Sequence, residues 1–284
     1  MFKSFSWLYR RSLRRGAYLF LSLLVMAGIS FGSPHPTQAI SWPELIFRGI
    51  QLIQLSNLSD SQEVALGKQI NEELASSEVR LYRDRAATQY INQIGQRLAQ
   101  QSERPNLPYT FQIVDDDQIN AFATMGGFVY VNKGLIAAAD NEAQLASVMA
   151  HEIGHIAARH AVKQLRQMAI AEGLASATGL DRSVAVQIGV ELALRRPHSR
   201  EAEYQADQLG LQTLGRAGYA QSAMIDFMKK LLNRSSPPSF LSTHPATADR
   251  IAAMQQAINP GQAEVGDGLN NAVYRQRINQ FLRS

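Results

Sequence analysis

The chain has 284 residues, of which 45% are hydrophobic and 18% charged, and it contains no cysteine. This composition is typical of a folded protein and excludes an intrinsically disordered one. Without cysteine, thiolate zinc ligands, disulfides and a cysteine nucleophile are excluded. Residues 1–39 hold five of the 28 basic residues and none of the 24 acidic ones. The rest of the chain is therefore close to neutral, and we expect no nucleic-acid partner.

Residues 1–39 have the pattern of a secretory signal peptide. A basic start is followed by an uncharged apolar run over residues 17–29, and the small residues Thr37 and Ala39 follow at a cleavage site. The apolar run is shorter than the roughly 20 residues of a membrane-spanning helix, although an uncleaved anchor is the alternative. We therefore expect an exported protein, in a periplasm or an equivalent extracytoplasmic lumen.

Helices dominate the pattern after this segment. Residues 40–59 are expected to form a linker or an amphipathic segment. Apolar periodicity predicts helices from Asp60 or Ser61 to about Leu74 and over about 84–101, 141–168, 183–194, 199–216, 221–233, 245–257 and 271–282. Strands are expected over 109–114, 121–124 and 128–132, with the last two joined across Gly126 and Gly127. The fold class is therefore α+β, mostly helical, with one small sheet.

Three side chains on the predicted helix 141–168 indicate a metal site. His151 and His155 are four residues apart, so both imidazoles share one face of the helix and can bind one tetrahedral ion. Glu152 follows the first histidine, where it can act as the general base of a metal-assisted hydrolysis. The surrounding residues are apolar, which predicts a buried helix. Burial of these polar groups without a metal or other partners would be energetically unfavourable. The alternative is a surface helix that carries them by chance.

A catalytic zinc site needs a third protein ligand and one open position. His160 is five residues beyond His155, which turns it away from the shared face, and His198 is a candidate without further support. Glu203 is the better candidate, because Asp207 lies four residues later and can accept a hydrogen bond from a ligating histidine. The alternative for both acids is simple stabilisation of a helix N-terminus.

Four segments carry further motifs in a fixed order. They are N-A-F-A with G-G-F-V-Y-V in residues 120–131, V-M-A-H-E-I-G-H in 148–155, S-R-E-A-E-Y-Q-A-D in 199–207, and S-T-H-P with R-I in 242–251. With these motifs the chain resembles the HtpX-like and CAAX-prenyl-protease superfamily of gluzincins over about residues 60–258, especially its soluble periplasmic, BepA-like branch. The resemblance implies a zincin-like domain with a long active-site helix and one Zn²⁺ per chain, bound by His151, His155 and Glu203.

The same resemblance implies a substrate-binding strand. It makes Phe128 to Val131 an edge strand that pairs with an extended substrate, with contacts from Gly127, Phe128, Val129 and Tyr130. Pairing through the backbone makes little demand on substrate sequence. An exposed strand edge without such a role would promote aggregation. The alternative is a plain hairpin in the core.

His244 lies in a loop that, by resemblance, approaches the metal. It could bind zinc as a fourth ligand at rest and leave on activation, or it could stabilise the developing oxyanion as a catalytic residue. The alternative is a turn residue before Pro245. Arg250 is expected to steady the same region, as Asp207 steadies a ligating histidine.

These expectations combine into one domain organisation and one function. A signal peptide (1–39) and the segment 40–59 precede a zinc metallopeptidase domain (60–258), and a C-terminal extension with a short helix follows (259–284). Charged residues interrupt 161–196, so no membrane span is expected there. The expected activity is cleavage of extended or misfolded envelope proteins in protein quality control, with peripheral membrane or outer-membrane assembly association. The alternative is a chaperone-like binding protein with a latent or structural zinc site.

Overall fold

The computed structural model describes residues 52–53, 57–174, 179–245, 248–258, 261 and 263–282. The signal peptide expected at 1–39 and most of the segment 40–59 lie outside these ranges. In chain order the elements are β1 (Leu52–Ile53), α3 (Asp60–Glu73), the π-helical turn η2 (Leu74–Glu78), α4 (Arg85–Ala99), β2 (Thr110–Val114), β3 (Ala121–Thr124), β4 (Phe128–Asn132), α5 (Lys133–Ala138), α6 (Glu142–Ala157), α7 (His160–Ala171), β5 (Leu180–Asp181), α8 (Arg182–Arg195), α9 (Arg200–Arg216), α10 (Ser222–Leu232), α11 (Phe240–Thr243), α12 (Ala248–Ala257) and α13 (Asn271–Ile278).

The α+β, mostly helical fold is confirmed, and its main sheet has three strands in the order β2-β4-β3. Strand β4 is parallel to β2 and antiparallel to β3. The turn between β3 and β4 uses Gly126 and Gly127 at φ +80° and +101°, backbone conformations that favour glycine. A second, two-stranded sheet pairs β1 with β5.

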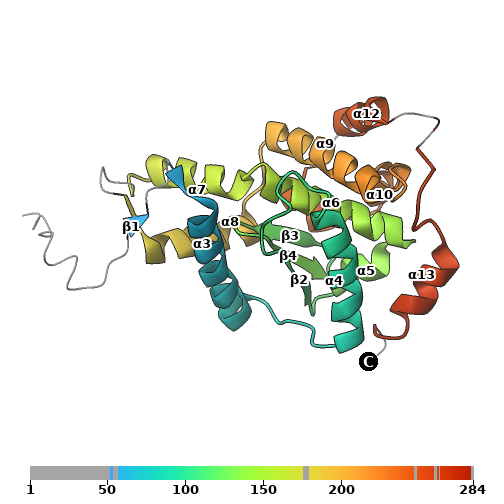
Figure 1. Cartoon of the computed structure of the whole chain (residues 1–284), viewed down its shortest axis with the longest axis horizontal. Coiled ribbons are helices and arrows are strands. Elements are labelled where there is room, and N and C mark those ends of the chain that lie inside the picture. Colours follow the sequence, from blue (N-terminus) through green and yellow to red (C-terminus); the bar gives the residue numbers. More distant parts are fainter. Residues whose placement is uncertain are drawn as a thin grey trace, which may run out of the picture. The chain divides into compact units, whose positions relative to one another are not determined.

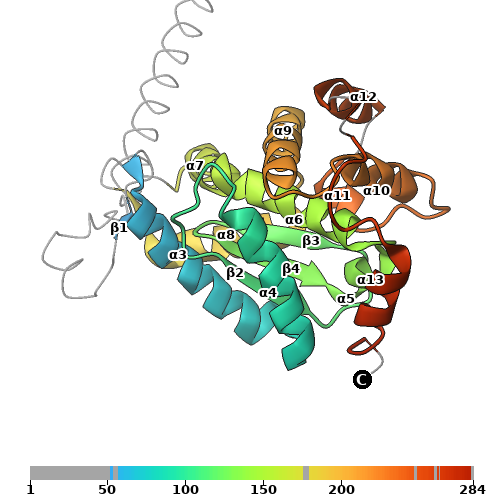
Figure 2. The ribbon, with the colours of Figure 1, turned by 45° about the vertical axis from the view of Figure 1, so that its right-hand side comes forward.

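The sheet is covered by helices on both faces, as Figures 1 and 2 show. Side chains that alternate along the strands divide between two apolar clusters. Val129 and Val131 pack with α4 and α6, whereas Phe128 and Tyr130 pack with α3, α7 and α8. Because both faces are covered, every residue of β4 is buried. This double burial explains why β4 is uniformly apolar up to its last residue.

Helix α6 runs through the middle of the fold. All residues from Ala143 to Ile156 are buried, since the sheet lies on one side and α9 and α10 lie on the other (Figure 1). Asn141 caps the helix, because its side chain accepts the N–H of Gln144. A helix that is buried on all sides is expected to be apolar on all sides. The few polar side chains of α6 therefore need a specific explanation.

The prediction of one helix over 141–168 is wrong. Helix α6 ends at Ala157 and α7 begins at His160, because Arg159 adopts a left-handed conformation at φ +57°. The Arg159 guanidinium pairs with Glu63, with Nε 3.0 Å from Oε2, and also donates to the carbonyl of Leu58. These contacts stabilise a conformation that is otherwise unfavourable for a residue with a side chain.

Two further segments complete the described chain. Helix α12 (Ala248–Ala257) matches the predicted helix 245–257 except that Pro245 is not helical, and the short α11 precedes it. After it, residues 263–282 return to the core, where Tyr274, Ile278 and Phe281 are each at most 3% exposed. In the parts of the chain that the structure describes, no helix has the length and apolar character needed to cross a membrane.

Candidate metal centre

Helix α6 supplies two histidines and a glutamate to one buried site. His151 and His155 lie one turn apart, and the Nε2 atoms of their imidazoles are separated by 3.1 Å. Both residues are at most 4% exposed. Glu152 is also buried, and its Oε1 accepts no hydrogen bond from the described residues. The Nε2 atom of His244 lies 3.4 Å from that oxygen.

Helix α9 brings Glu203 to the same point. Its Oε2 is 3.4 Å from Nε2 of His151, and its Oε1 is 3.3 Å from Nε2 of His155. The two helices approach closely because Gly154 has no side chain: a Cβ there would lie 2.6 Å from the carbonyl oxygen of Ala206. Glu203 is 1% exposed, so it is not a solvated acid that merely complements the helix dipole.

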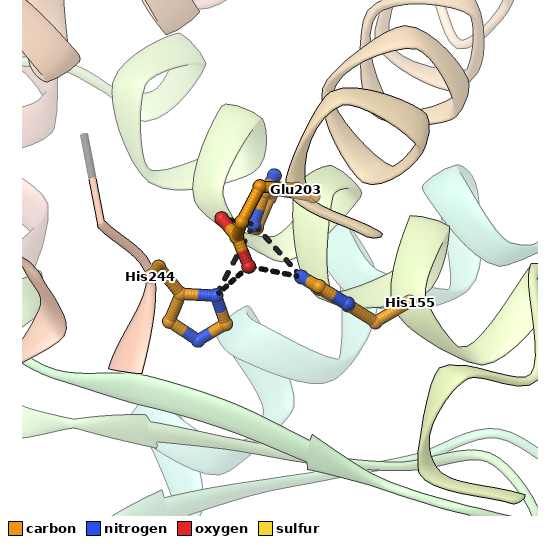
Figure 3. A group of neighbouring side chains, drawn as sticks. His155, Glu203 and His244 are labelled. Atoms are coloured by element: carbon orange, nitrogen blue, oxygen red, sulfur yellow. Dashed lines mark hydrogen bonds and ion pairs between the residues drawn. The ribbon is translucent and has the colours of Figure 1, made fainter. Parts of the chain in front are cut away.

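His244 follows α11 and completes the group. Its Nδ1 lies 3.3 Å from Nε2 of His151 and 3.2 Å from Oε1 of Glu203. Its ring stacks on Phe240 with the centroids 4.6 Å apart. Figure 3 shows the imidazoles of His155 and His244 directed at the Glu203 carboxylate from two sides.

These four donor atoms have the spacing of a tetrahedral metal site. Among Nε2 of His151, Nε2 of His155, Nδ1 of His244 and Oε1 of Glu203, the four separations given above lie between 3.1 and 3.3 Å. One ligand atom from each of the four residues lies within 4.8 Å of the others. Ligand atoms at about 2.0–2.1 Å from zinc are about 3.3 Å apart in a regular tetrahedron. Imidazole nitrogen and carboxylate oxygen are also donors that zinc accepts. The group can therefore hold one metal ion.

Asp207 and Arg250 hold this group from behind. Oδ1 of Asp207 lies 3.0 Å from Nδ1 of His151, which leaves Nε2 to face the metal position. Arg250 donates from Nε and Nη2 to both oxygens of Asp207 at 2.7 Å, and its Nη1 lies 2.7 Å from Oε2 of Glu203. The same Nη1 donates to the carbonyl of Pro245 at 2.8 Å. One buried guanidinium thus connects two carboxylates with the loop before α12.

The three buried carboxylates differ in their pKa. Burial alone would raise the pKa of Glu203, but hydrogen bonds from the surrounding histidines hold it well below its usual range. Burial acts the same way on Asp207, and hydrogen bonds from Arg250 and a histidine likewise leave its pKa lowered. Burial raises the pKa of Glu152, and the neighbouring imidazoles offset this only in part. Two carboxylates therefore stay charged, and the third is suited to take up a proton.

His160 lies beside the metal group, although its position five residues after His155 predicted the opposite. The break at Arg159 lets the chain turn back, and Nδ1 of His160 lies 2.8 Å from Nδ1 of His155. Nε2 of His160 is 3.0 Å from Oε1 of Gln205 on α9. His160 lies outside the group of four donors. No sequence signal indicates this neighbour, because arginine is an unusual residue for a left-handed helix break.

His198 stacks on an imidazole of the metal group without joining it. Its ring centroid is 4.0 Å from that of His155, at an angle of 28°, and its backbone N–H donates to the carbonyl of Thr243. Burial, reinforced by the electrostatic influence of His244, lowers the pKa of His198 to about 3. His198 is therefore a neutral side chain beside the metal group.

A groove beside the metal group follows β3. It is lined by Phe122 to Met125, by His198 and His244, and by residues of α8. The prediction that β4 is an edge strand is wrong, because β4 pairs with β2 on one side and with β3 on the other. The backbone groups of Gly127, Phe128, Val129 and Tyr130 are therefore not an open edge for a substrate, and the alternative of a core hairpin is correct.

Strand β3 is the edge strand on the side of the metal group. The N–H of Asn132 donates to the carbonyl of Asn120, and residues alternate in an antiparallel ladder. The backbone groups of Ala121 and Ala123 therefore point to the open edge of the sheet. The amide of Ala123 forms a hydrogen bond with the Glu152 carboxylate. The parallel pairing of β2 with β4 has no local signal in the sequence, so the strand order could not be predicted.

Comparisons with known proteins point to one family. The family model described as peptidase family M48 matches residues 85–258. The chain is 34% identical over 221 residues to the beta-barrel assembly-enhancing protease of Escherichia coli, which covers 72% of this chain and 45% of that protein. With the protein of the same name from Yersinia pestis it shares 32% over 265 residues, covering 86% and 53%. The mitochondrial metalloendopeptidase OMA1 of Schizosaccharomyces pombe is 26% identical over 234 residues, covering 77% and 69%. The chain thus spans about half the length of the beta-barrel assembly-enhancing proteases.

Proposed function

This chain belongs to peptidase family M48, and on that basis we propose that it is a zinc-dependent endopeptidase. The observation that carries the proposal is the buried four-donor group with tetrahedral spacing, next to a Glu152 oxygen that accepts no hydrogen bond from the described residues. A purely structural metal site has no use for such a carboxylate. The zinc ligands in this proposal are His151, His155 and Glu203, with one ion per chain.

Glu152 is the general base of the proposed reaction. Bound zinc supplies Lewis acidity, which makes a water molecule more acidic and polarises the carbonyl of the scissile bond. Glu152 takes the proton from the attacking water and passes it to the departing amine. The raised pKa that burial gives this carboxylate favours its uptake of a proton. Asp207 and Arg250 keep the ligands oriented during these transfers.

The proposed substrate is an extended segment of an unfolded or misfolded protein. Of the two outward-facing residues of β3, Ala123 lines the groove beside the metal group and offers its backbone carbonyl there, since its N–H bonds the Glu152 carboxylate. An added strand pairs through its backbone, so many sequences can bind. An exposed edge strand can promote aggregation, but one that leads to a general base and a metal site also has a function in substrate binding. The substrate contact moves with this proposal from β4 to β3.

The proposed setting is the cell envelope. The relatives from Escherichia coli and Yersinia pestis carry the name beta-barrel assembly-enhancing protease, which supports a role near outer-membrane assembly and the cleavage of envelope proteins in quality control. The basic start and apolar run of residues 1–39 support export to a periplasm or equivalent lumen. In this proposal residues 60–258 form the peptidase domain, and the segment 40–59 precedes it.

His244 is proposed to close the fourth metal position in the resting enzyme. Its Nδ1 is one of the four donor atoms, and its Nε2 lies 3.4 Å from Glu152. Substrate then has to displace this side chain, which the short α11 and the following loop carry. A His244→Ala variant should keep its zinc and cleave casein faster than the wild type. Unchanged cleavage would count against the resting role, and slower cleavage would favour stabilisation of the oxyanion.

Casein cleavage by the wild type and by Glu152→Gln tests the proposed activity. Both proteins should bind one zinc, because Glu152 is not a ligand. Cleavage by the variant should be roughly 10²–10⁴-fold slower, the usual contribution of a general base. Glu72→Gln is the matched control, because Glu72 is an exposed acid on α3. Equal cleavage by Glu152→Gln and the wild type, or none by a fully zinc-loaded wild type, would contradict the proposal.

A chaperone-like binding protein is the second candidate. The observation that favours it is the fourth donor, His244, because a structural zinc has four closed protein ligands. In that case the wild type and Glu152→Gln would bind an unfolded protein equally well and neither would cleave it. The same pair of proteins therefore separates the two functions.

A further inference from the structure

A chain of hydrogen bonds leads from the metal group to the protein surface, and we propose that His160 is the positioning residue for His155. The Nδ1 atoms of these two imidazoles are 2.8 Å apart, and Nε2 of His160 is 3.0 Å from Oε1 of Gln205. His160 is 4% exposed, whereas Gln205 is an exposed residue of α9. The inference rests on the proposed zinc site.

The chemistry of the three side chains fixes where the protons lie. His155 directs Nε2 toward the other donor atoms, so this nitrogen must be unprotonated to bind a metal. Its proton is then on Nδ1, which donates to Nδ1 of His160. His160 therefore carries its proton on Nε2, which donates to Gln205. The amide oxygen only accepts hydrogen bonds, so it selects one tautomer for both histidines.

The backbone is arranged to bring His160 to this position. In a continuous helix, a side chain five residues after His155 would point about 140° away from it. The left-handed conformation of Arg159 interrupts the helix and returns the next residue to the ligand. Glu63 and the carbonyl of Leu58 hold the Arg159 side chain. An unfavourable conformation that the surrounding structure stabilises is common at functional sites.

The two ligating histidines are held by groups of different charge. His151 has the carboxylate of Asp207 at its Nδ1, and Arg250 compensates that charge. His155 has instead a neutral imidazole followed by a neutral amide. Three carboxylates are already buried at the site, and a fourth would add a large desolvation penalty. The neutral chain orients His155 without that penalty.

Zinc affinity of the full chain, measured by competition with a chromophoric chelator, tests the role of His160. His160→Ala should bind zinc roughly 10–100-fold more weakly, the usual effect of losing such a partner. His160→Asn should recover most of the affinity, because its Oδ1 can accept the His155 N–H. Gln167→Ala, an exposed position on the same helix, should match the wild type. Equal affinities for His160→Ala and the wild type would overturn the inference, as would a loss that asparagine does not restore.

Gln205 offers a variant pair that leaves the core undisturbed. Gln205→Glu keeps an acceptor and should bind zinc at least as tightly as the wild type, whereas Gln205→Leu should bind it more weakly. The visible spectrum of the cobalt-substituted protein should shift for the leucine variant and stay close to the wild type for the glutamate variant. Identical affinities and spectra for the two variants would overturn the inference. Failure of the wild type itself to bind zinc would instead contradict the proposed function.

Discussion

At the scale of single residues, Arg250 balances the charges of the site. Its guanidinium is 1% exposed and contacts both Asp207 and Glu203. A planar guanidinium bonds a carboxylate through two parallel N–H groups. Lysine cannot form this two-point contact, so it cannot replace the arginine without losing hydrogen bonds. Without this side chain, two buried carboxylates would lose their permanent positive partner.

Replacement of Arg250 should therefore destabilise the protein strongly. Arg250→Gln is expected to lower the free energy of unfolding of the metal-free protein by about 3–5 kcal/mol, the usual effect of breaking a buried ion pair from one side. Urea denaturation followed by circular dichroism measures this change. Arg234→Gln, at an exposed position, is the control and should change stability little. A loss for Arg250→Gln no larger than that of the control would show that the ion pairs do not support the fold.

The residues of the site differ in how far the sequence could predict their neighbours. The spacing of His151 and His155 predicted their shared face, since a helix fixes that geometry locally. Glu203 was the better candidate for the third ligand because Asp207 lies four residues later, and the family resemblance then implied that it binds the metal. The contact of His160 could not be expected, because it depends on the backbone of Arg159 and not on any pattern.

At the scale of elements, the packing of α6 against α9 sets the spacing between the donors. Gly154 lies between two ligating histidines, and Gly210 lies opposite them, where a Cβ would come within 3.1 Å of the His151 backbone. Both glycines permit the close approach that places Glu203 near the histidines. Residues with side chains at these positions would separate the two helices.

Gly154→Ala should therefore destabilise the protein, although alanine favours a helix interior by about 1 kcal/mol over glycine. The added Cβ meets a backbone oxygen that cannot move alone, and overpacking of this kind costs about 1–3 kcal/mol. The melting temperature in thermal denaturation and the affinity for zinc should both be lower than in the wild type. Gly215→Ala is the control, since the three atoms nearest to its Cβ all belong to the Gln221 side chain and not to the backbone. Equal stability of the two variants would show that the close approach is not required.

The sequence predicted elements better than their arrangement. Periodicity placed most helices and all three strands of the main sheet within a few residues, because these patterns are local. The order of the strands depends on the pairing of β2 with β4, which residues far apart in the chain decide. The edge strand was therefore assigned to β4 instead of β3, although both strands were correctly located.

At the scale of the whole molecule, the segment after the family match contributes to the core. Tyr274 of α13 is fully buried and donates its hydroxyl to the carbonyl of Ile136 at 2.6 Å. The hydroxyl of Tyr82 also donates to the carbonyl of Phe281. The ring of Phe281 also lies against Tyr90 of α4, with the centroids 6.0 Å apart. The segment 263–282 thus packs on α4 and α5, and the fold depends on residues beyond position 258.

Tyr274→Ala should test this dependence. Removal of a buried aromatic ring typically costs about 3–5 kcal/mol, and the carbonyl of Ile136 would also lose its partner. Val273→Ala is the control, because Val273 is adjacent and 59% exposed. Urea denaturation should separate the two variants clearly. Similar stabilities would show that α13 is only loosely attached.

Removal and restoration of the metal addresses the proposed activity as a whole. Casein cleavage by the full chain should disappear after dialysis against a zinc chelator, because the metal position carries the Lewis acidity. One equivalent of zinc per chain should restore it in the wild type, whereas in Glu152→Gln the restored cleavage should be roughly 10²–10⁴-fold slower. Cleavage that persists after complete removal of zinc, or that zinc restores equally in both proteins, would contradict a zinc peptidase in which Glu152 is the base.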